Sequence, residues 1–351
     1  MKEYQLNYFQ LGLLISGFNI SASFFQFIVI GLVPHISKKH LIMLGFLWTS
    51  IFIFGTSLAS NYIQFLVLFI IAGIGISIFH PSASSILSKT FPNRSRGRAL
   101  SIYLFSGKIG AFTSVLLANW IASFMTWHFP LYIWATSGLV IALIVAVSNP
   151  KSLEEPEVKR PIVTLRHSRS QSIGTLVIVY AIYAMLARGL CTYIPIYLVE
   201  YRGLSITTAG MSVGLLIICG SVGSILIGFQ ADRFDIKRVV LVLITISAIL
   251  TFLLTTYVSY IYYIVIISLL GIAVYTISPL TQILVSEYTL GSERTRVFGF
   301  LFTISEGLGA LTPFLMGLIA DTSNLQTSFY FLITMVCVGS ISMLSLVSKN
   351  G

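Results

Sequence analysis

Residues 73–108 read GIGISIFHPSASSILSKTFPNRSRGRALSIYLFSGK, and residues 271–306 read GIAVYTISPLTQILVSEYTLGSERTRVFGFLFTISE. Aligned without a gap, the two stretches place a proline, a serine and two arginines at the same positions of each copy. These pairs are Pro81 with Pro279, Ser88 with Ser286, Arg96 with Arg294 and Arg98 with Arg296. The first copy ends on Lys108 and the second on Glu306. Such internal similarity predicts a chain built from two related halves.

The composition around these repeats is typical of a membrane protein. Hydrophobic residues make up 56% of the 351 residues and charged residues only 9%, whereas soluble domains carry about 25% charged residues. Apolar runs recur that are long enough to cross a hydrocarbon core of roughly 30 Å as helices, which satisfy their own backbone polar groups. We therefore predict an all-α membrane protein with eleven spans, near residues 9–33, 41–60, 62–87, 99–124, 128–148, 174–199, 206–230, 238–257, 259–286, 297–319 and 326–347.

A polar interruption at residues 149–173 separates the first five spans from the last six. Its prolines and mixed charges are typical of a solvated linker. We predict an N-terminal bundle over residues 1–148 and a C-terminal bundle over residues 174–351. Two equal copies would have six spans each, so we expect that the first half lacks the counterpart of its first helix.

Basic residues indicate the orientation. Of the 21 Lys and Arg, only Lys2 and Arg202 fall on one side of the predicted membrane, Lys108 and Arg188 fall inside spans, and the others fall on the second side. The positive-inside rule then predicts a cytoplasmic linker and C-terminus, with the N-terminus outside the plasma membrane. The net charge of +10 is explained by topology and by contact with membrane lipid, and we expect no nucleic-acid partner.

Residues 228–238, GFQADRFDIKR, combine a glycine, an Asp-Arg pair and a basic cluster. They resemble the loop signature of the major facilitator superfamily, which lies between the second and third helix of each half. The matching residues are Gly228, Asp232, Arg233, Lys237 and Arg238, and the first-half copy GLVPHISKKH keeps Gly31, Lys38 and Lys39. The resemblance implies a two-bundle transporter fold, with eleven helices here in place of twelve. Residues 73–87 and 188–205 (RGLCTYIPIYLVEYRGLS) further resemble the fosmidomycin-resistance-like exporters of that superfamily.

The loop motif has two interpretations. Asp232 at a helix end among basic residues can pair with an arginine and cap a neighbouring helix, which would form a gating latch on the cytoplasmic side. Alternatively, it is a solvated loop charge that adds little stability. The spacing favours the latch in the second half. In the first half His35 and Ile36 replace the Asp-Arg pair, which favours the solvated loop.

Three charged residues fall near the middle of predicted spans: Lys108, Arg188 and Glu306. A charge near the bilayer centre costs about 2.5–3.5 kcal/mol on insertion scales, so it normally faces the protein interior and a partner. Snorkelling of Lys108 is the weakest interpretation, because a lysine stem of about 6 Å does not reach an interface roughly 15 Å away. A structural ion pair and a water-filled cavity, where these groups meet substrate or protons, both remain open.

The resemblance implies that the spans carrying Arg188 and Glu306 are neighbours, so we expect these two residues to pair. The repeat gives Lys108 the equivalent position in the first half. Its partner would then lie on the absent first helix.

His80 and two prolines complete the candidate site. His80 is either a satisfied core histidine or a proton carrier. Glu306 is the stronger candidate for proton coupling, because a carboxylate whose partner changes with conformation also changes its affinity for protons. Pro81 and Pro279 predict kinks in two repeat-related spans. Tyr183, Tyr193 and Tyr275 are candidates to line the cavity, although interior packing explains them equally. Close helix packing is expected at Gly107, Gly110, Gly307 and Gly309.

These features predict a secondary transporter that moves a small organic solute, anionic or amphiphilic, by alternating access, with proton-coupled efflux as the expected mode. Two alternatives remain: an importer of a metabolite such as an organic acid or a sugar, and a non-transporting truncated or sensor relative. Enzymatic and ATP-driven activities are disfavoured, because the sequence has no nucleophile–base pair, HExxH set or Walker motif. The cysteines occur singly, so we expect neither a metal nor a cofactor. The expected partners of a monomer are a small-molecule substrate, protons and membrane lipid.

Overall fold

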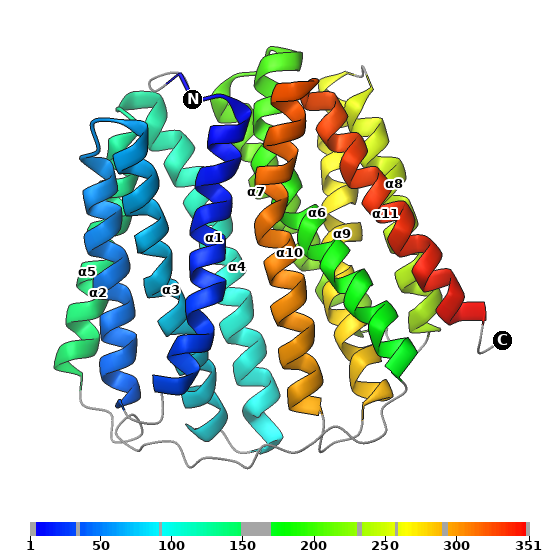
Figure 1. Cartoon of the computed structure of the whole chain (residues 1–351), viewed down its shortest axis with the longest axis horizontal. Coiled ribbons are helices and arrows are strands. Elements are labelled where there is room, and N and C mark those ends of the chain that lie inside the picture. Colours follow the sequence, from blue (N-terminus) through cyan, green and yellow to red (C-terminus); the bar gives the residue numbers. More distant parts are fainter. Residues whose placement is uncertain are drawn as a thin grey trace. The chain divides into compact units, whose positions relative to one another are not determined.

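The computed structural model describes residues 5–32, 36–90, 93–148, 170–229, 234–256, 259–289 and 294–348. Within these ranges the chain forms eleven helices and no strand (Figure 1). The helices are α1 (Tyr8–Leu32), α2 (Lys38–Ser57), α3 (Tyr62–Thr90), α4 (Asn93–Phe124), α5 (His128–Val147), α6 (Ser170–Arg202), α7 (Ile206–Phe229), α8 (Ile236–Thr255), α9 (Tyr260–Tyr288), α10 (Arg294–Thr322) and α11 (Leu325–Ser348). Each helix matches one predicted span with ends shifted by a few residues, so the all-α prediction is confirmed.

Ten of these helices are long and apolar enough to cross a membrane. The helix that does not meet this condition within the described residues is α4, which begins with the arginine-rich segment NRSRGR and contains Lys108 near its middle. A multi-pass membrane protein is therefore confirmed, and Lys108 interrupts the apolar run of α4.

Local signals in the sequence fix several helix ends. The Ser37 hydroxyl accepts a hydrogen bond from the His40 N–H at the start of α2, and the Asp235 carboxylate accepts one from the Lys237 N–H at the start of α8. Both are N-caps that satisfy a donor left free at a helix start. Helix α6 ends at Arg202, and the next residue, Gly203, has a φ of 65°, the left-handed conformation that glycine adopts without steric cost.

The chain divides into two compact units. The first comprises residues 1–6, 14–107 and 117–161, and the second comprises residues 7–13, 108–116 and 162–351. The second unit therefore takes in the first turns of α1 and two turns of α4, in addition to α6–α11. The three-part division at residues 148 and 174 stays a prediction.

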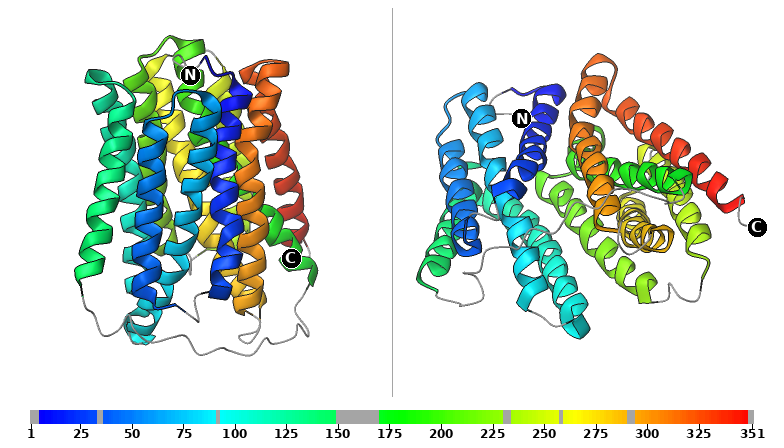
Figure 2. Two further views of the ribbon diagram at one scale, coloured as in Figure 1. Left: turned by 60° about the vertical axis from the view of Figure 1, so that its left-hand side comes forward. Right: turned by 60° about the horizontal axis from the view of Figure 1, so that its bottom comes forward.

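In the first unit, α2 packs against α3 on one side and α5 on the other (Figures 1 and 2). Glycines allow the close approach of α2 and α3, because a Cβ placed on Gly75 would lie 2.7 Å from the carbonyl oxygen of Gly45. Trp48 on α2 donates its indole N–H to the Ile71 carbonyl of α3 at 2.8 Å. Small residues and a buried polar contact of this kind join helices inside membranes.

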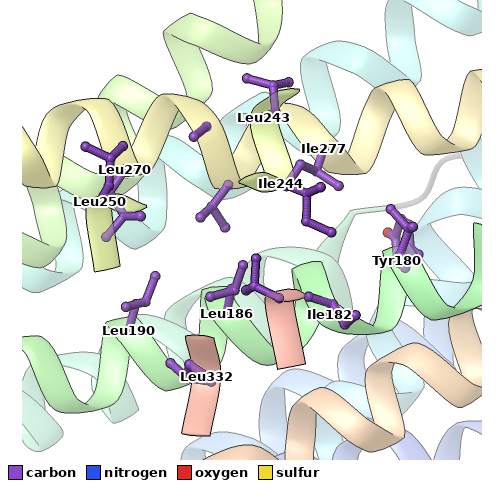
Figure 3. Close-up of a cluster of buried hydrophobic side chains, with 14 of the residues drawn as sticks. Tyr180, Ile182, Leu186, Leu190, Leu243, Ile244, Leu250, Leu270, Ile277 and Leu332 are labelled. Atoms are coloured by element: carbon purple, nitrogen blue, oxygen red, sulfur yellow. The ribbon is translucent and has the colours of Figure 1, made fainter. Parts of the chain in front are cut away.

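In the second unit, α6 contacts α7, α9, α10 and α11 and so forms the centre of the bundle (Figure 2). Leu186 and Leu190 of α6 are fully buried against apolar side chains of α8 and α9, among them Ile244, Leu270 and Ile277 (Figure 3). This densely packed layer fixes the position of α6 relative to its neighbours. It thereby also fixes the polar residues that α6 carries on its other faces.

Candidate substrate and ion-coupling site

Close packing of α6 against α10 is the basis of the candidate site. A Cβ placed on Gly309 of α10 would lie 2.9 Å from the Cβ of Ala184 on α6, and one placed on Gly189 would lie 2.6 Å from the sulfur of Met316. These are distances at which a side chain larger than hydrogen does not fit without movement. The two helices therefore approach closely at Gly309, one turn after Glu306, and at Gly189, next to Arg188.

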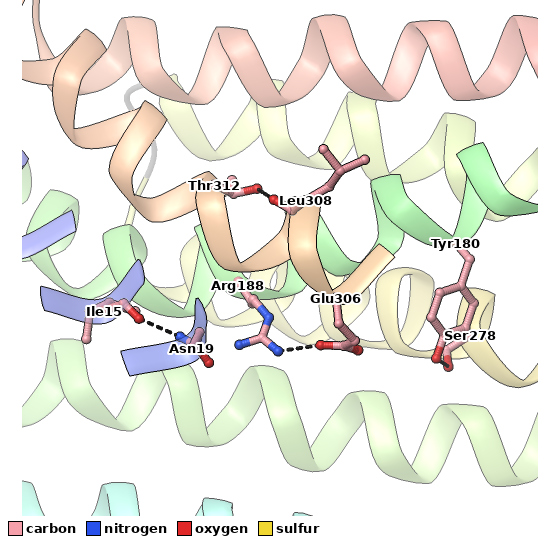
Figure 4. A network of polar contacts seen from close by, with 8 residues as sticks. All are labelled: Ile15, Asn19, Tyr180, Arg188, Ser278, Glu306, Leu308 and Thr312. Carbon is pink, nitrogen blue, oxygen red and sulfur yellow. Dashed lines mark hydrogen bonds and ion pairs between the residues drawn. The ribbon is translucent and has the colours of Figure 1, made fainter. Parts of the chain in front are cut away.

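Arg188 of α6 donates a hydrogen bond from Nη2 to Oε2 of Glu306 on α10, and the two side chains form an ion pair (Figure 4). The pair predicted from the sequence is confirmed. The side chain of Arg188 is 27% exposed and that of Glu306 is 37% exposed, so neither charged group is fully buried in the protein. An ion pair removes most of the cost of placing two charges in the membrane interior, while the remaining exposure leaves the carboxylate accessible to a proton or a solute.

A row of aromatic residues from three helices lies beside this pair. Tyr180 and Tyr183 of α6 have ring centroids 5.3 Å apart, Tyr183 lies 6.3 Å from Tyr275 of α9, and Tyr180 lies 5.6 Å from Phe302 of α10. All three pairs are edge-to-face, the arrangement that aromatic quadrupoles favour. The Tyr180 hydroxyl accepts hydrogen bonds from Ser278 Oγ at 3.3 Å and from the Gln282 amide at 3.4 Å (Figure 4).

Lys108 belongs to the two turns of α4 that lie in the second unit. Its ammonium nitrogen is 5.8 Å from the centroid of the Tyr275 ring, and no carboxylate among the described residues forms an ion pair with it. A cation–aromatic contact contributes about 0.5–2 kcal/mol, whereas a charge near the bilayer centre costs about 2.5–3.5 kcal/mol or more. The ring therefore offsets only part of the cost of the charge.

Two neighbours fix the position of Tyr275. Its hydroxyl lies 3.5 Å from the thiol of Cys191, which follows Arg188 by one turn on α6. A Cβ placed on Gly220 of α7 would lie 2.7 Å from the Tyr275 ring, so the missing side chain at Gly220 provides the space that the ring occupies. Sequence reasoning did not identify Cys191 or Gly220. A signal for Cys191 was available, because it lies on the same face of the helix as Arg188.

The remaining predicted residues are distributed as follows. His80 and Pro81 fall within α3, but their side chains lie outside the described residues. Pro279 lies inside α9, which continues on both sides of it, and the predicted kink stays a prediction. Ser278, the repeat counterpart of His80, contacts Tyr180.

The loop motif is described only in part. Asp232 and Arg233 lie outside the described residues, so the latch stays a prediction. Gly31 and Gly228 lie near the ends of α1 and α7, and Lys38, Lys39, Lys237 and Arg238 lie at the starts of α2 and α8. Arg238 pairs with Asp235 at 3.2 Å on an exposed surface, where an ion pair adds little stability.

Tyr193 does not line the site, contrary to one of the two interpretations given above. It is fully buried, and its hydroxyl donates to the carbonyl of Pro313 at 2.8 Å and to that of Tyr8 at 3.1 Å. Nearby, the Asp321 carboxylate accepts the backbone N–H groups of Tyr8 at 3.0 Å and Phe9 at 2.9 Å. The Tyr8 hydroxyl donates to Glu200. This polar cluster fastens the first turn of α1 to α6 and α10, and no pattern in the sequence indicated it.

The glycines expected at close contacts fall into two classes. Gly309 lies at a tight contact with Ala184, as predicted. At Gly107, Gly110 and Gly307 a Cβ would meet no described atom within 4 Å, so the expectation of close packing is wrong at these three positions. Two of them flank Lys108 and one follows Glu306, which leaves open space next to both charged groups.

Several curated transporters are similar to this chain at low sequence identity. The fosmidomycin resistance protein of Escherichia coli (strain K12) is 25% identical over 333 residues, which cover 92% of this chain and 80% of that protein. The hexuronate transporter of Bacillus subtilis (strain 168) is 20% identical over 345 residues, covering 92% and 82%. The probable galactarate/D-glucarate transporter of Bacillus subtilis (strain 168) is 23% identical over 190 residues. That match covers 46% of this chain, and the chain spans 42% of that relative.

Solved transporter structures share the fold. A bacterial homologue of the human lysosomal transporter Spinster superimposes with a TM-score of 0.78 at 16% identity, over 97% of this chain and 89% of that one. A mutant nucleoside transporter superimposes with a TM-score of 0.80 at 13% identity, over 98% and 92%. The model of the Major Facilitator Superfamily matches residues 1–222 and again residues 176–350. The two-bundle transporter fold is thus confirmed, and the chain belongs to the major facilitator superfamily.

Proposed function

We propose that this protein is a proton-coupled secondary transporter that exports a small organic solute, anionic or amphiphilic, across the plasma membrane. The observation that carries the proposal is the partly exposed ion pair between Arg188 and Glu306 in the middle of two packed helices. A charge pair with this exposure can exchange partners during a transport cycle, whereas a sealed pair would only join the helices.

Proton coupling follows from the two states that Glu306 can occupy. With Arg188 as its partner the carboxylate has a counter-charge. When an anionic solute bound nearby draws Arg188 away, Glu306 loses its counter-charge and can take up a proton, so the solute and the proton bind in alternation. This exchange corresponds to antiport, in which protons enter as the solute leaves. The protein acts as a monomer in membrane lipid, with its C-terminus in the cytoplasm.

The names of the similar proteins support an anionic solute, and experiment has to decide the direction of transport. Hexuronate, galactarate and glucarate are carboxylate anions, and two of the similar proteins are named as their transporters. The fosmidomycin resistance protein is named for resistance to a compound, which favours export. Import of an organic acid is therefore the second candidate function, and a non-transporting sensor role is the third.

Flux into proteoliposomes distinguishes the three functions. Purified protein is reconstituted with the membrane potential clamped, and uptake of glucuronate, glucarate, fosmidomycin and octanesulfonate is measured under opposite pH gradients. Antiport predicts uptake of at least one compound driven by an acidic lumen, with alkalinisation of the lumen. Uptake driven by an acidic exterior would overturn export in favour of proton-coupled import. Absence of flux for every compound would overturn transport of these anion classes.

A further inference from the structure

We propose that Lys108, Tyr275 and an adjoining apolar cavity form one binding site for a single-chain anionic amphiphile, with the anionic head at Lys108 and the chain in the cavity. The inference rests on the proposed transport function, because it names the chemical class of solute that the same helices bind. Three observations carry it: a cation with no carboxylate partner among the described residues, an aromatic residue that holds it, and an apolar cavity whose lining begins one turn away.

The charges among the described residues leave Lys108 without an acidic counterpart. Glu306 is paired with Arg188, Asp235 with Arg238, Asp321 holds the start of α1 and Glu200 binds Tyr8. The remaining described carboxylate, Glu287, lies in the last turn of α9, far along the helix from Tyr275. A mid-membrane ammonium without a carboxylate is expected to take its counter-charge from a ligand.

Tyr275 holds the ammonium without neutralising it. The ring face receives Lys108 at 5.8 Å, while the hydroxyl at the other end of the side chain is engaged by the Cys191 thiol at 3.5 Å. Gly220 leaves the space for this ring. Lys108 is therefore held at a defined position, and a Cβ placed on Gly110 in the same unit would meet no described atom within 4 Å, which leaves space beside the ammonium.

The apolar cavity is lined by residues that lie one and two turns farther along the same helices. Phe112 and Leu116 follow Lys108 by one and two turns of α4 and line the cavity, as does Ile267, two turns before Tyr275 on α9. Its volume is 330 Å³, at the lower end of the range for small-molecule sites. Leu198, Leu204, Met211, Leu215, Ile218 and Ile264 supply most of the rest of the lining, and the polar groups are limited to Thr208, Ser212 and Tyr263.

The dimensions suit a chain of about eight carbons. Lys108 and Leu116 are eight residues apart, which corresponds to roughly 12 Å along a helix. Met211 and Ile264 at the edge of the cavity are 50% and 38% exposed, so the cavity opens toward the surroundings of the bundle. An amphiphile can thus enter with its chain from the membrane interior and its head toward Lys108.

Cys191 provides a reporter that does not depend on transport. With Cys219 and Cys337 replaced by serine, the thiol that touches Tyr275 is the only one left in the chain. Its reaction with a neutral maleimide is followed in nanodiscs with octanesulfonate, ethanesulfonate, glucarate or octyltrimethylammonium as the added probe. We expect octanesulfonate to slow labelling and octyltrimethylammonium to have no effect. Ethanesulfonate and glucarate should require at least about tenfold higher concentration, because they leave the cavity empty.

Two sets of variants test the two ends of the site. Lys108→Gln should weaken protection by octanesulfonate about tenfold or more, and Lys108→Arg should retain it, because the charge-assisted contact is kept. Met211→Trp should fill the cavity and weaken protection by octanesulfonate but not by ethanesulfonate. Val222→Trp, on the same helix, is a control with similar exposure that does not line the cavity.

Melting temperatures of all variants confirm that they fold, and Lys108→Arg keeps the test valid if Lys108→Gln does not fold. Equal protection of the Lys108→Gln variant and the parent by octanesulfonate would overturn the proposal. Protection by glucarate at lower concentration than octanesulfonate would also overturn it, in favour of a polar anion. Because labelling needs neither a gradient nor flux, loss of transport with intact protection would contradict the proposed function alone.

Discussion

The guanidinium of Arg188 on α6 donates to the carboxylate of Glu306 on α10, at the sequence position where the first repeat carries Lys108. Equivalent positions of the two repeats therefore carry opposite charges, and the two charges have different neighbours. Glu306 forms an ion pair with Arg188, whereas the ammonium of Lys108 lies over the ring of Tyr275. This asymmetry is the basis on which we assign the proton to Glu306 and the anionic head group of the solute to Lys108.

Removing one partner of the Arg188–Glu306 pair should lower the free energy of unfolding more than removing both partners. Arg188→Gln leaves a carboxylate without a counter-charge inside the membrane, and we expect a loss of about 1.5–3 kcal/mol in the free energy of unfolding. Arg188→Gln/Glu306→Gln should recover most of this loss, because two neutral amides can bond to each other. Thermal unfolding of the parent protein, Arg188→Gln, Glu306→Gln and the double variant forms a double-mutant cycle, and strictly additive losses would show that the pair does not couple the two helices.

Two glycines of α10 form a matched pair for testing the close contact with α6. Gly309→Ala would place a Cβ 2.9 Å from that of Ala184, so we expect destabilisation of about 1–3 kcal/mol and weakening of the Arg188–Glu306 pair. Gly307→Ala meets no described atom within 4 Å and should be neutral or stabilising by up to about 1 kcal/mol, because alanine favours the helix. Equal melting temperatures for the two variants would refute this packing.

The start of α1 should depend on Asp321. Asp321→Ala removes the acceptor of two backbone N–H groups, those of Tyr8 and Phe9, and loss of such a cap costs about 0.5–2 kcal/mol. We expect faster amide hydrogen exchange in the peptide that begins α1. Asp321→Asn keeps one acceptor oxygen and should show a smaller increase. Unchanged exchange in Asp321→Ala would mean that the carboxylate does not hold this turn.

The eleven helices could be predicted from sequence because each is a long apolar run with a polar break on either side. The Arg188–Glu306 pair could also be predicted, since few charges lie inside the spans and the family resemblance made their helices neighbours. The contact of Lys108 with Tyr275 could not, because an aromatic ring leaves no complementary charge in the sequence to search for.

Other features depend on which residues the packing brings together. Asp321 lies near the end of α10, and nothing in its neighbourhood indicates that it caps a helix more than three hundred residues earlier. Gly307 and Gly309 lie two residues apart in the same apolar run, and the sequence does not distinguish them, yet of the two only Gly309 faces Ala184. Tyr193 and Tyr275 are both tyrosines in apolar runs, and only the three-dimensional contacts separate the buried one from the one that contacts Lys108.

The central claim is that Glu306 carries the proton that is exchanged for the solute, and solute counterflow tests it most directly. Counterflow requires solute binding and alternating access but no net proton movement. Accumulation driven by an acidic lumen requires net proton movement as well. We predict that Glu306→Gln retains counterflow of the transported solute and loses proton-driven accumulation. Proton-driven accumulation by Glu306→Gln at the rate of the parent protein would contradict the claim.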